Sequence, residues 1–264
     1  MRWRDGQLIE TGGACEPALN CWGAFTTAGC DGGIPLLWDR HRSRLQNSAE
    51  FLGAPAGVSV PDEAEIFAFL SAAGIEGPAR LRVVVRMVGG GRWSVEATAA
   101  ATAVAGPESP PVRLSVDRWD AAPPLAGHKT LSRLSWDLAR QRAAAAGADD
   151  VVLVDAAGRI LETSVANVWV VQGHVARTPP APTRCLPGIM RGWLLENLPA
   201  AGIRAEECDL DVSEIDEADE VWISNALIGV KRVGWLLDGR WESWSIFERL
   251  VAAGVPAPGW PRSV

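Results

Sequence analysis

The sequence predicts an α+β fold with mixed sheets arranged in two lobes. Runs of β-branched and apolar residues cluster along the chain, and the amphipathic segments between them do not show the regular alternation of βαβ units. Residues 121–127, AAPPLAG, are rich in Pro and Gly and have no periodicity, which indicates a linker. We therefore expect a smaller N-terminal α+β domain over residues 1–120 and a larger C-terminal domain over residues 128–264, a division that the length of 264 residues permits.

The N-terminal part opens with RWRDGQLIE, a hairpin pattern in which Asp5-Gly6 can take the positive φ angles of a tight turn. GAFTTAG predicts a short strand. Asp39 is a suitable N-cap for a helix through HRSRLQNSAEFLG, which Gly53 ends. PDEAEIFAFLSAAG predicts a second helix, ended by Gly74. The segments ARLRVVVRMV and WSVEATAAATAV predict strands joined by a GGGR turn, and PVRLSVDR predicts a third strand.

Beyond the linker, the alanine-rich segment predicts a helix from Lys129 to about Ala146, ended by Gly147. Strands are expected in DVVLVD, RILETS, NVWVVQ and HVART, with DAAG as the turn between the first two. IMRGWLLENLPAAG has apolar residues at helical spacing. IRAEECDL and EVWISNALIGV predict two more strands, and WSIFERLVAAG predicts a closing helix.

Composition and charge narrow the class of partner. Hydrophobic residues make up 48 % and charged residues 22 % of the chain, as in ordinary globular proteins. The net charge of −7 argues against nucleic acid as a partner. It does not exclude an anionic small-molecule substrate, because a few arginines can dominate the potential of one pocket.

Cysteine and histidine usage predicts neither a disulfide framework nor a metal site. The five Cys lack CxxC spacing, and the three His are scattered. The first residues, MRWRDGQLIE, lack the apolar core of a signal peptide, and no run approaches the ~18 apolar residues of a membrane span. We expect a cytoplasmic protein without a membrane partner.

Two residues have side chains suited to one flat aromatic cofactor. Lys129 supplies an amine, which can form an imine with an aldehyde. Glu162, in LETSVAN, supplies a carboxylate that can hold a proton on a pyridine nitrogen and so make the ring an electron sink. Composition alone favours ordinary solvated positions for both residues, since Lys and Glu are mostly exposed.

The order of the motifs decides between these interpretations. Seven segments follow one another along nearly the whole chain: AFTTAG, RHRSRLQNSAEFLG, AGHKTLSRL, GADDVVLVDAAGRILETSVANVWVV, TPP, LPGIMR and ADEVWISNALIGV. In this order they resemble the fold-type IV family of pyridoxal-phosphate enzymes, which contains branched-chain and D-amino acid aminotransferases and aminodeoxychorismate lyase. The resemblance implies the two-lobed fold of D-amino acid aminotransferase, pyridoxal 5′-phosphate as cofactor, and a homodimer that buries its active site at a two-fold interface.

The resemblance also implies roles for single residues. The lysine would form the Schiff base, the glutamate would hold the proton on the pyridine nitrogen, and the arginine of RHRSRL would bind the phosphate. Free backbone N–H groups at the helix start behind LPG would bind the same phosphate. The implied cofactor-binding residues are Lys129, Glu162, Arg44, Ile189, Met190, Ser224 and Asn225.

Departures from the family pattern favour the lyase. Branched-chain aminotransferases carry a tyrosine where this chain has Leu134, and a glycine-threonine pair where it has Ser224-Asn225. The FTT, IMR and NAL triplets look like those of the lyase. Many relatives have threonine where Met190 stands, so here only the backbone of that residue is expected to contact the phosphate.

The expected reaction is the conversion of 4-amino-4-deoxychorismate into 4-aminobenzoate and pyruvate, a step of folate synthesis. Lys129 would move the proton of the amine-bearing carbon, and Thr27 would deliver a proton to the leaving pyruvate. Arg92 in GGGRW is the preferred candidate for a substrate carboxylate, ahead of Arg86. Backbone groups of Asn225 and Ala226 are further candidates for that contact.

Two other functions stay open at this point. A class IV aminotransferase, acting on a branched-chain or D-amino acid or on an amine, would use the same lysine and glutamate. A non-catalytic binding protein could keep the fold alone, although the intact Lys129, Glu162 and Arg44 argue against it.

Overall fold

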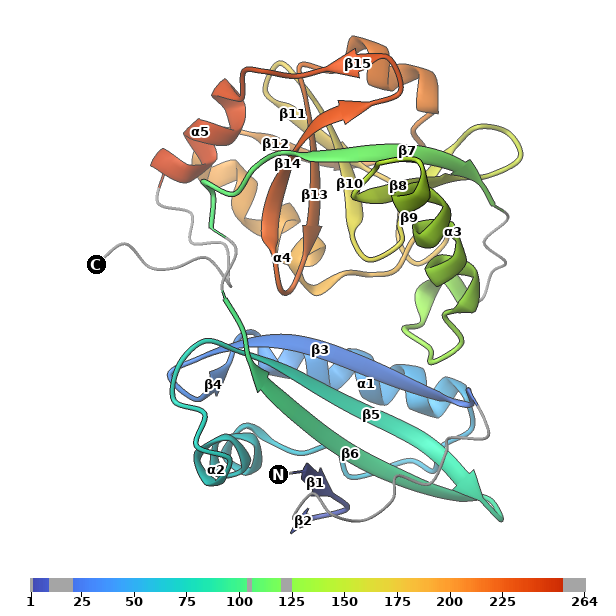
Figure 1. The fold of residues 1–264 in the computed structure, drawn as a ribbon, viewed down its shortest axis with the longest axis vertical. Coiled ribbons are helices and arrows are strands. Elements are labelled where there is room, and N and C mark those ends of the chain that lie inside the picture. Colours follow the sequence, from blue (N-terminus) through green and yellow to red (C-terminus); the bar gives the residue numbers. More distant parts are fainter. Residues whose placement is uncertain (1, 10–20, 104–105, 120–124, 254–264) are drawn as a thin grey trace. The chain divides into compact units, whose positions relative to one another are not determined.

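The computed structural model divides the chain into two compact units (Figure 1). The first unit comprises Met1–Val104 and His128–Ser132, and the second comprises Ala105–Gly127 and Arg133–Val264. Both combine helices with a sheet, which confirms the predicted α+β class. The structure describes residues 2–9, 21–103, 106–119 and 125–253.

The first unit is built on a six-stranded sheet with the order β2-β1-β6-β5-β3-β4, antiparallel at every pairing of the described strands. The predicted hairpin is confirmed, with φ angles of 49° at Asp5 and 86° at Gly6. The elements are β1 (Arg2–Arg4), β2 (Gln7–Ile9), β3 (Gly23–Asp31), β4 (Ile34–Pro35), α1 (Trp38–Phe51), α2 (Glu63–Ala72), β5 (Ala79–Gly89) and β6 (Arg92–Ala101).

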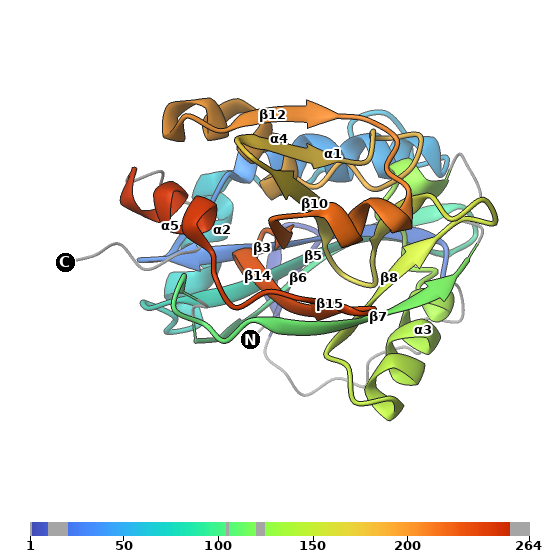
Figure 2. The same cartoon turned by 90° about the horizontal axis from the view of Figure 1, so that it is seen from above.

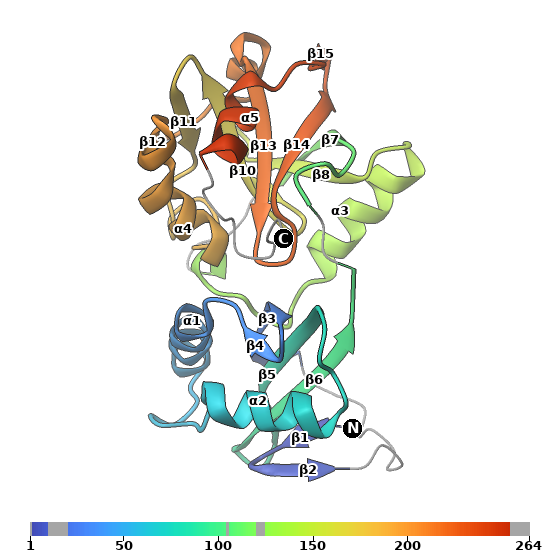
Figure 3. The same ribbon diagram turned by 90° about the vertical axis from the view of Figure 1, so that its left-hand side faces the viewer.

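Alternation along the strands separates a core face from a polar face of this sheet. Every second residue of β3 and β5, such as Ala24, Ala28 and Leu81, packs with residues of α1 and α2 in one buried cluster. Figure 3 shows α1 and α2 against this sheet. Since neighbouring strand residues point to opposite faces, Phe25 and Thr27 face away from that cluster.

The second unit contains a nine-stranded sheet with the order β12-β11-β10-β13-β14-β7-β8-β9, and β15 pairs with β14. Its helices are α3 (Leu134–Ala145), α4 (Ile189–Asn197) and α5 (Ser245–Ala252), with 3-10 turns η1 (Leu125–Gly127), η2 (Leu198–Ala201) and η3 (Val212–Glu217). Its strands are β7 (Val112–Arg118), β8 (Asp150–Val154), β9 (Ile160–Thr163), β10 (Asn167–Gln172), β11 (Val175–Thr178), β12 (Arg204–Glu207), β13 (Glu220–Asn225), β14 (Gly229–Leu236) and β15 (Gly239–Arg240).

This sheet is mixed. β7 runs parallel to β8 and to β14, and β11 runs parallel to β12, whereas the other pairs are antiparallel. Parallel neighbours require a crossover connection, and α3 and α4 lie in two of these connections. α3 packs beside β7 and β8, as Figure 2 shows.

The boundary between the units differs from the expected one. β7, expected in the N-terminal domain, pairs with β8 and β14 and therefore belongs to the second unit. His128–Ser132 belong to the first unit because their backbone pairs with β3. Within the expected linker, residues 121–124 lie outside the described residues, and Leu125–Gly127 form η1.

Two helix starts also differ. α3 begins at Leu134 and not at Lys129, because the backbone of residues 129–131 bonds to β3 instead of to a helical turn. Leu37, in the left-handed region with a φ of 55°, is the N-cap of α1, and Asp39 lies in the first turn. The predicted helix ends are confirmed, because Gly53, Gly74 and Gly147 have positive φ angles just beyond α1, α2 and α3.

Within the described ranges, no helix has the length and apolar character needed to cross a membrane. Cys21, Cys30, Cys185 and Cys208 carry free thiols. The described part of the chain has no group of three or more His, Cys, Asp or Glu side chains that could hold a metal ion.

Candidate active site

Lys129 lies on an extended segment that β3 holds through its backbone. The N–H of Phe25 donates to the Lys129 carbonyl at 2.9 Å, and the N–H of Leu131 donates to the Gly23 carbonyl at 2.8 Å. β3 also pairs with β5 so closely that a Cβ atom at Gly23 would lie 2.5 Å from the Val85 carbonyl oxygen. Backbone contacts therefore fix where the Lys129 side chain starts.

Two cations meet the ring of Phe25. The Lys129 amine lies 4.9 Å from the ring centroid, and the Arg82 guanidinium lies 4.0 Å from it. Arg82 pairs across the ladder with Thr27, so Thr27, Arg82 and Phe25 lie on the same face of the sheet. The proposed proton donor Thr27 is thus on the face of the Lys129 amine. Arg82 was not among the predicted site residues. The alternation of side chains along each of the two segments RLRVVV and AFTTAG is the signal that could have identified it.

On the opposite face of β3, the Thr26 side chain forms hydrogen bonds with two side chains of α1, His41 and Arg44. The Thr26 hydroxyl lies 2.7 Å from Nδ1 of His41 and accepts a hydrogen bond from Nη2 of Arg44 at 3.1 Å. Thr26 and His41 are each 1 % exposed. Burial, reinforced by the positive charges of Arg44 and Lys129, holds the pKa of His41 well below its ordinary value, so this imidazole is neutral.

This network orients the predicted phosphate ligand. A guanidinium can only donate, so the Thr26 oxygen accepts from Arg44 and its own proton is free to reach His41. His41 and Thr26 were not among the predicted site residues. The spacing of His41 and Arg44, three apart on one helix, places both on the side of α1 that faces β3.

The predicted carboxylate ligands lie elsewhere in the first unit. Arg92 is exposed and opens β6 opposite Gly89, seven residues beyond Arg82 on β5. At about 3.3 Å per residue, Arg92 lies roughly 23 Å along the sheet from Arg82. It lies roughly 17 Å from Val84, the residue opposite the Phe25 that bonds to the Lys129 backbone, so Arg92 does not lie beside Lys129 of its own chain. Arg86 bonds at 3.2 Å to the carboxylate of Glu96.

In the second unit, Glu162 lies on β9 with two hydrogen-bond donors. Nε1 of Trp136 donates to Oε1 at 3.1 Å, and the backbone N–H of Leu186 donates to Oε2 at 3.1 Å. Donors to a carboxylate favour its charged form. The side chain is half-buried, so this charge is partly withdrawn from water.

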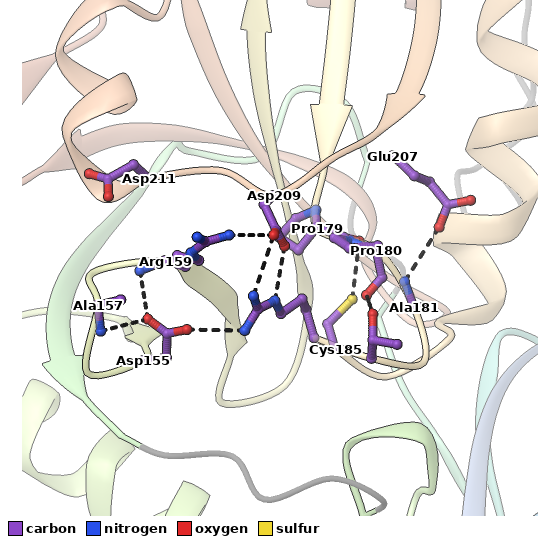
Figure 4. Close-up of polar contacts among 12 residues, drawn as sticks. Asp155, Ala157, Arg159, Pro179, Pro180, Ala181, Cys185, Glu207, Asp209 and Asp211 are labelled. Atoms are coloured by element: carbon purple, nitrogen blue, oxygen red, sulfur yellow. Dashed lines mark hydrogen bonds and ion pairs between the residues drawn. The ribbon is translucent and has the colours of Figure 1, made fainter.

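The loop that supplies the Leu186 N–H, residues 179–188, is held by side chains around it. Arg184 bonds to Asp155 at 3.1 Å and to Asp209 at 2.9 Å, and Arg159 also contacts Asp209 (Figure 4). The thiol of Cys185 donates to the Pro179 carbonyl at 3.4 Å. These contacts come from the β8–β9 turn and from the segment after β12, so they tie the loop to the sheet.

The loop ends at the predicted phosphate-binding helix start. Gly188 is the N-cap of α4 and offers no side-chain cap, so the N–H groups of the first turn are available to an anion. A Cβ atom at Gly188 would lie 2.0 Å from Oδ1 of Asn167, which explains the glycine. Ile189 and Met190 bury their side chains and can offer only backbone, as the sequence predicts for Met190.

Ser224, Asn225 and Ala226 lie at the end of β13 and in the turn after it. Ser224, opposite Asn167 in the ladder, is fully buried and accepts from Nε1 of Trp169 at 2.9 Å. Oδ1 of Asn225 accepts from two backbone N–H groups of the following turn, and its Nδ2 donates to the Val165 carbonyl at 3.2 Å. These side chains shape the turn.

Known proteins with the same sequence pattern identify the chain. The model of the class IV aminotransferase family matches residues 23–234. The chain belongs to this family. It is 32 % identical over 111 residues to an aminodeoxychorismate lyase of Vibrio harveyi, a match covering 42 % of this chain and 41 % of the relative. It is also 39 % identical over 93 residues to branched-chain-amino-acid aminotransferase 6 of Arabidopsis thaliana, over 34 % of this chain and 26 % of the relative.

Solved structures of this class IV family share the whole fold. The 4-amino-4-deoxychorismate lyase of Pseudomonas aeruginosa superposes with a TM-score of 0.77 at 26 % identity, over 96 % of this chain and 97 % of that one. The curated relatives are matched over less than half of their length. The superposition shows that the chain has the fold of fold-type IV enzymes, as expected. The family depends on pyridoxal 5′-phosphate.

The residues described above fit this cofactor. In the first unit, the Lys129 amine suits the aldehyde and Arg44 suits the phosphate. In the second unit, the Glu162 carboxylate suits a protonated ring nitrogen, and the uncapped start of α4 suits a phosphate.

Proposed function

We propose that the chain is an aminodeoxychorismate lyase, which converts 4-amino-4-deoxychorismate into 4-aminobenzoate and pyruvate. The observation that carries this proposal is the Thr27–Arg82 pair on the face of Phe25, whose ring contacts the Lys129 amine. The reaction needs a base at the amine-bearing carbon, a proton donor for the departing three-carbon arm and a cation for substrate carboxylates. Lys129, Thr27 and Arg82 supply these three groups.

The cofactor, when bound, supplies an electron-withdrawing ring. The Lys129 amine would hold the aldehyde end of the cofactor and, once released, would act as the base for the substrate proton. The Glu162 carboxylate would hold the proton on the ring nitrogen. Arg44 of the first unit and the backbone of Ile189 and Met190 in the second unit would bind the phosphate, and backbone groups of Ser224, Asn225 and Ala226 are candidates for a substrate carboxylate.

A product assay tests the lyase. Purified enzyme with cofactor should release 4-aminobenzoate and pyruvate in equal amounts without any 2-oxo acid acceptor. Thr27→Val should slow pyruvate release by roughly 10²-fold or more, because it removes the proton donor. The matched control is Thr98→Val, which makes the same change on the other side of Arg82 in the ladder and should retain most activity. Release at the wild-type rate by Thr27→Val would remove that residue from the mechanism.

The second candidate is a class IV aminotransferase of branched-chain, D-amino acid or amine type. The 39 % identity to a branched-chain aminotransferase supports it, because that value exceeds the identity to the lyase relative over a segment of similar length. This function requires transfer of the amino group to a 2-oxo acid. Strict dependence of turnover on such an acceptor would identify it.

We also propose that the enzyme is a homodimer in which Arg92 serves the site of the other copy. The roughly 23 Å between Arg82 and Arg92 within one chain supports this, since a second copy could bring Arg92 to the pocket. Arg92→Ala should raise the Michaelis constant ten- to hundred-fold, the cost of one charge-assisted contact.

Mixed dimers provide the sharper test. Lys129→Ala and Arg92→Ala chains, co-expressed, should pair at random, so that half of the dimers are hybrids with one intact site. At substrate concentrations well below the wild-type Michaelis constant, where Arg92→Ala homodimers turn over slowly, the mixture should give about one quarter of wild-type activity. Light scattering should report a dimer at micromolar concentration. A fully active monomer would contradict the proposal.

A further inference from the structure

The Glu162 carboxylate receives one hydrogen bond from a side chain and one from the backbone. The indole N–H of Trp136 reaches Oε1 at 3.1 Å, and the Leu186 N–H reaches Oε2 at 3.1 Å. We propose that Trp136 is a positioning residue that sets the orientation and charge state in which Glu162 meets the ring nitrogen of the cofactor. This inference rests on the proposed role of Glu162.

The indole itself is held from several sides. The ring of Trp119 packs edge-on against it, with centroids 4.4 Å apart and an interplanar angle of 71°. The Arg133 guanidinium lies 5.4 Å from the Trp136 centroid and is anchored by a hydrogen bond from Nη2 to the Ser164 carbonyl. Trp119 and Trp136 both pack on a buried cluster formed by α3, β8 and β9, which contains Ala139, Ala143, Val151, Leu153 and Leu161.

This packing makes the indole a fixed donor. Trp136 lies in the first turn of α3, and Glu162 lies on β9, so helix and strand must keep their register for the hydrogen bond to form. The terminal torsion of a glutamate is otherwise broad, and one donor alone would let the carboxylate rotate. With both oxygens engaged, the carboxylate keeps one orientation, and both bonds favour its ionised form.

A comparison of two cofactors tests this inference without measuring turnover. Dissociation constants are measured for pyridoxal 5′-phosphate and for the analogue in which a C–H group replaces the ring nitrogen. Only the natural cofactor has a ring nitrogen with which an oriented carboxylate can interact. Wild type should therefore prefer it, and Trp136→Phe, which keeps an aromatic ring without the donor, should reduce this preference about tenfold.

Two variants serve as matched controls. Trp119→Phe disturbs the same packing but keeps the Trp136 donor. Trp235→Phe removes an indole whose N–H donates to the Leu237 carbonyl at 3.0 Å. Both should keep the wild-type preference. Trp136→His, which retains a ring N–H, should keep more of this preference than Trp136→Phe. If Trp136→Phe does not fold, Trp136→Leu, which also lacks the donor, takes its place.

The outcomes separate the inference from the function on which it rests. If Glu162→Gln leaves the preference unchanged, the proposed role of Glu162 is wrong. If Glu162→Gln abolishes the preference while Trp136→Phe weakens both cofactors equally, Trp136 is only a packing residue and the inference is overturned.

Discussion

In the first unit, Thr26 on β3 contacts both His41 and Arg44 of α1, and water is excluded from the hydroxyl and the imidazole. In the second unit, Glu162 is half-buried and depends on an indole and on the backbone N–H of Leu186. A buried network leaves polar atoms without partners when one member is removed, so its loss costs folding free energy. A half-buried carboxylate can be replaced with less damage to the fold.

The comparison therefore predicts a division between stability and chemistry. Substitutions on the core face of β3 should destabilise the first unit. Substitutions of Lys129 and Glu162 should impair catalysis with little change in the free energy of unfolding.

Lys129→Ala should have the largest effect on activity. It removes the covalent anchor and the base together, and the loss of the base alone is worth roughly 10²–10⁴-fold. Borohydride reduction of wild type with bound cofactor should label the peptide that contains Lys129. Label on the peptide that contains Lys231 would refute the assignment. Urea unfolding of the variant should match that of wild type.

Glu162→Gln preserves size and removes the charge that keeps the ring nitrogen protonated. We expect turnover to fall roughly 10²–10³-fold, as for other losses of one preorganised electrostatic contact. The cofactor should still bind, because Arg44 and the start of α4 remain. Wild-type turnover in this variant would contradict the role, and a large loss of stability would contradict the comparison of the two units.

Thr26→Val and Thr27→Val make the same change on opposite faces of one strand. Thr26→Val leaves His41 and Arg44 without their shared partner and should lower the free energy of unfolding by about 1–3 kcal/mol. Thr27→Val should change it by less than about 0.5 kcal/mol. Urea denaturation measures both. Equal effects would show that the buried network does not stabilise the fold.

His41 should make stability depend on pH in a known direction. Its folded-state pKa is depressed by burial, so below the ordinary value of 6.5 the unfolded chain binds a proton that the folded chain does not. Its contribution to stability is present above pH 6.5 and is lost as the pH falls. Between pH 7.0 and 5.5 this loss amounts to about 1 kcal/mol.

Unfolding free energies at the two pH values measure this effect. His41→Asn should remove the part of the decrease in unfolding free energy between pH 7.0 and 5.5 that His41 causes. His174→Asn, at an exposed position, should keep it. A wild-type pH dependence that survives in His41→Asn would assign it to another group.

Local pattern in the sequence was enough for much of the fold and for proposing the two central site residues. The hairpin at Asp5-Gly6 and the glycines that end α1, α2 and α3 follow from backbone angles that few other residues adopt. The strands follow from alternation and β-branched composition. Lys129 and Glu162 were found through the order of the motifs, a property of the linear chain.

The tertiary structure decided what depends on residues far apart in the sequence. α3 begins at Leu134 because β3, about a hundred residues earlier, takes the backbone of residues 129–131 as a neighbour. β7 belongs to the second unit because β8 and β14 pair with it. Helical or strand periodicity reports which face of an element is buried, but not which element covers it.

The same limit applies to the site. The order of motifs along the chain identifies an amine, a carboxylate and an arginine as candidate site groups. Only the folded chain placed Thr26 and His41 beside Arg44, and the Trp136 indole beside Glu162. Partners of this kind meet across separate elements, because hydrogen bonds depend on distances of about 3 Å that local propensity does not encode.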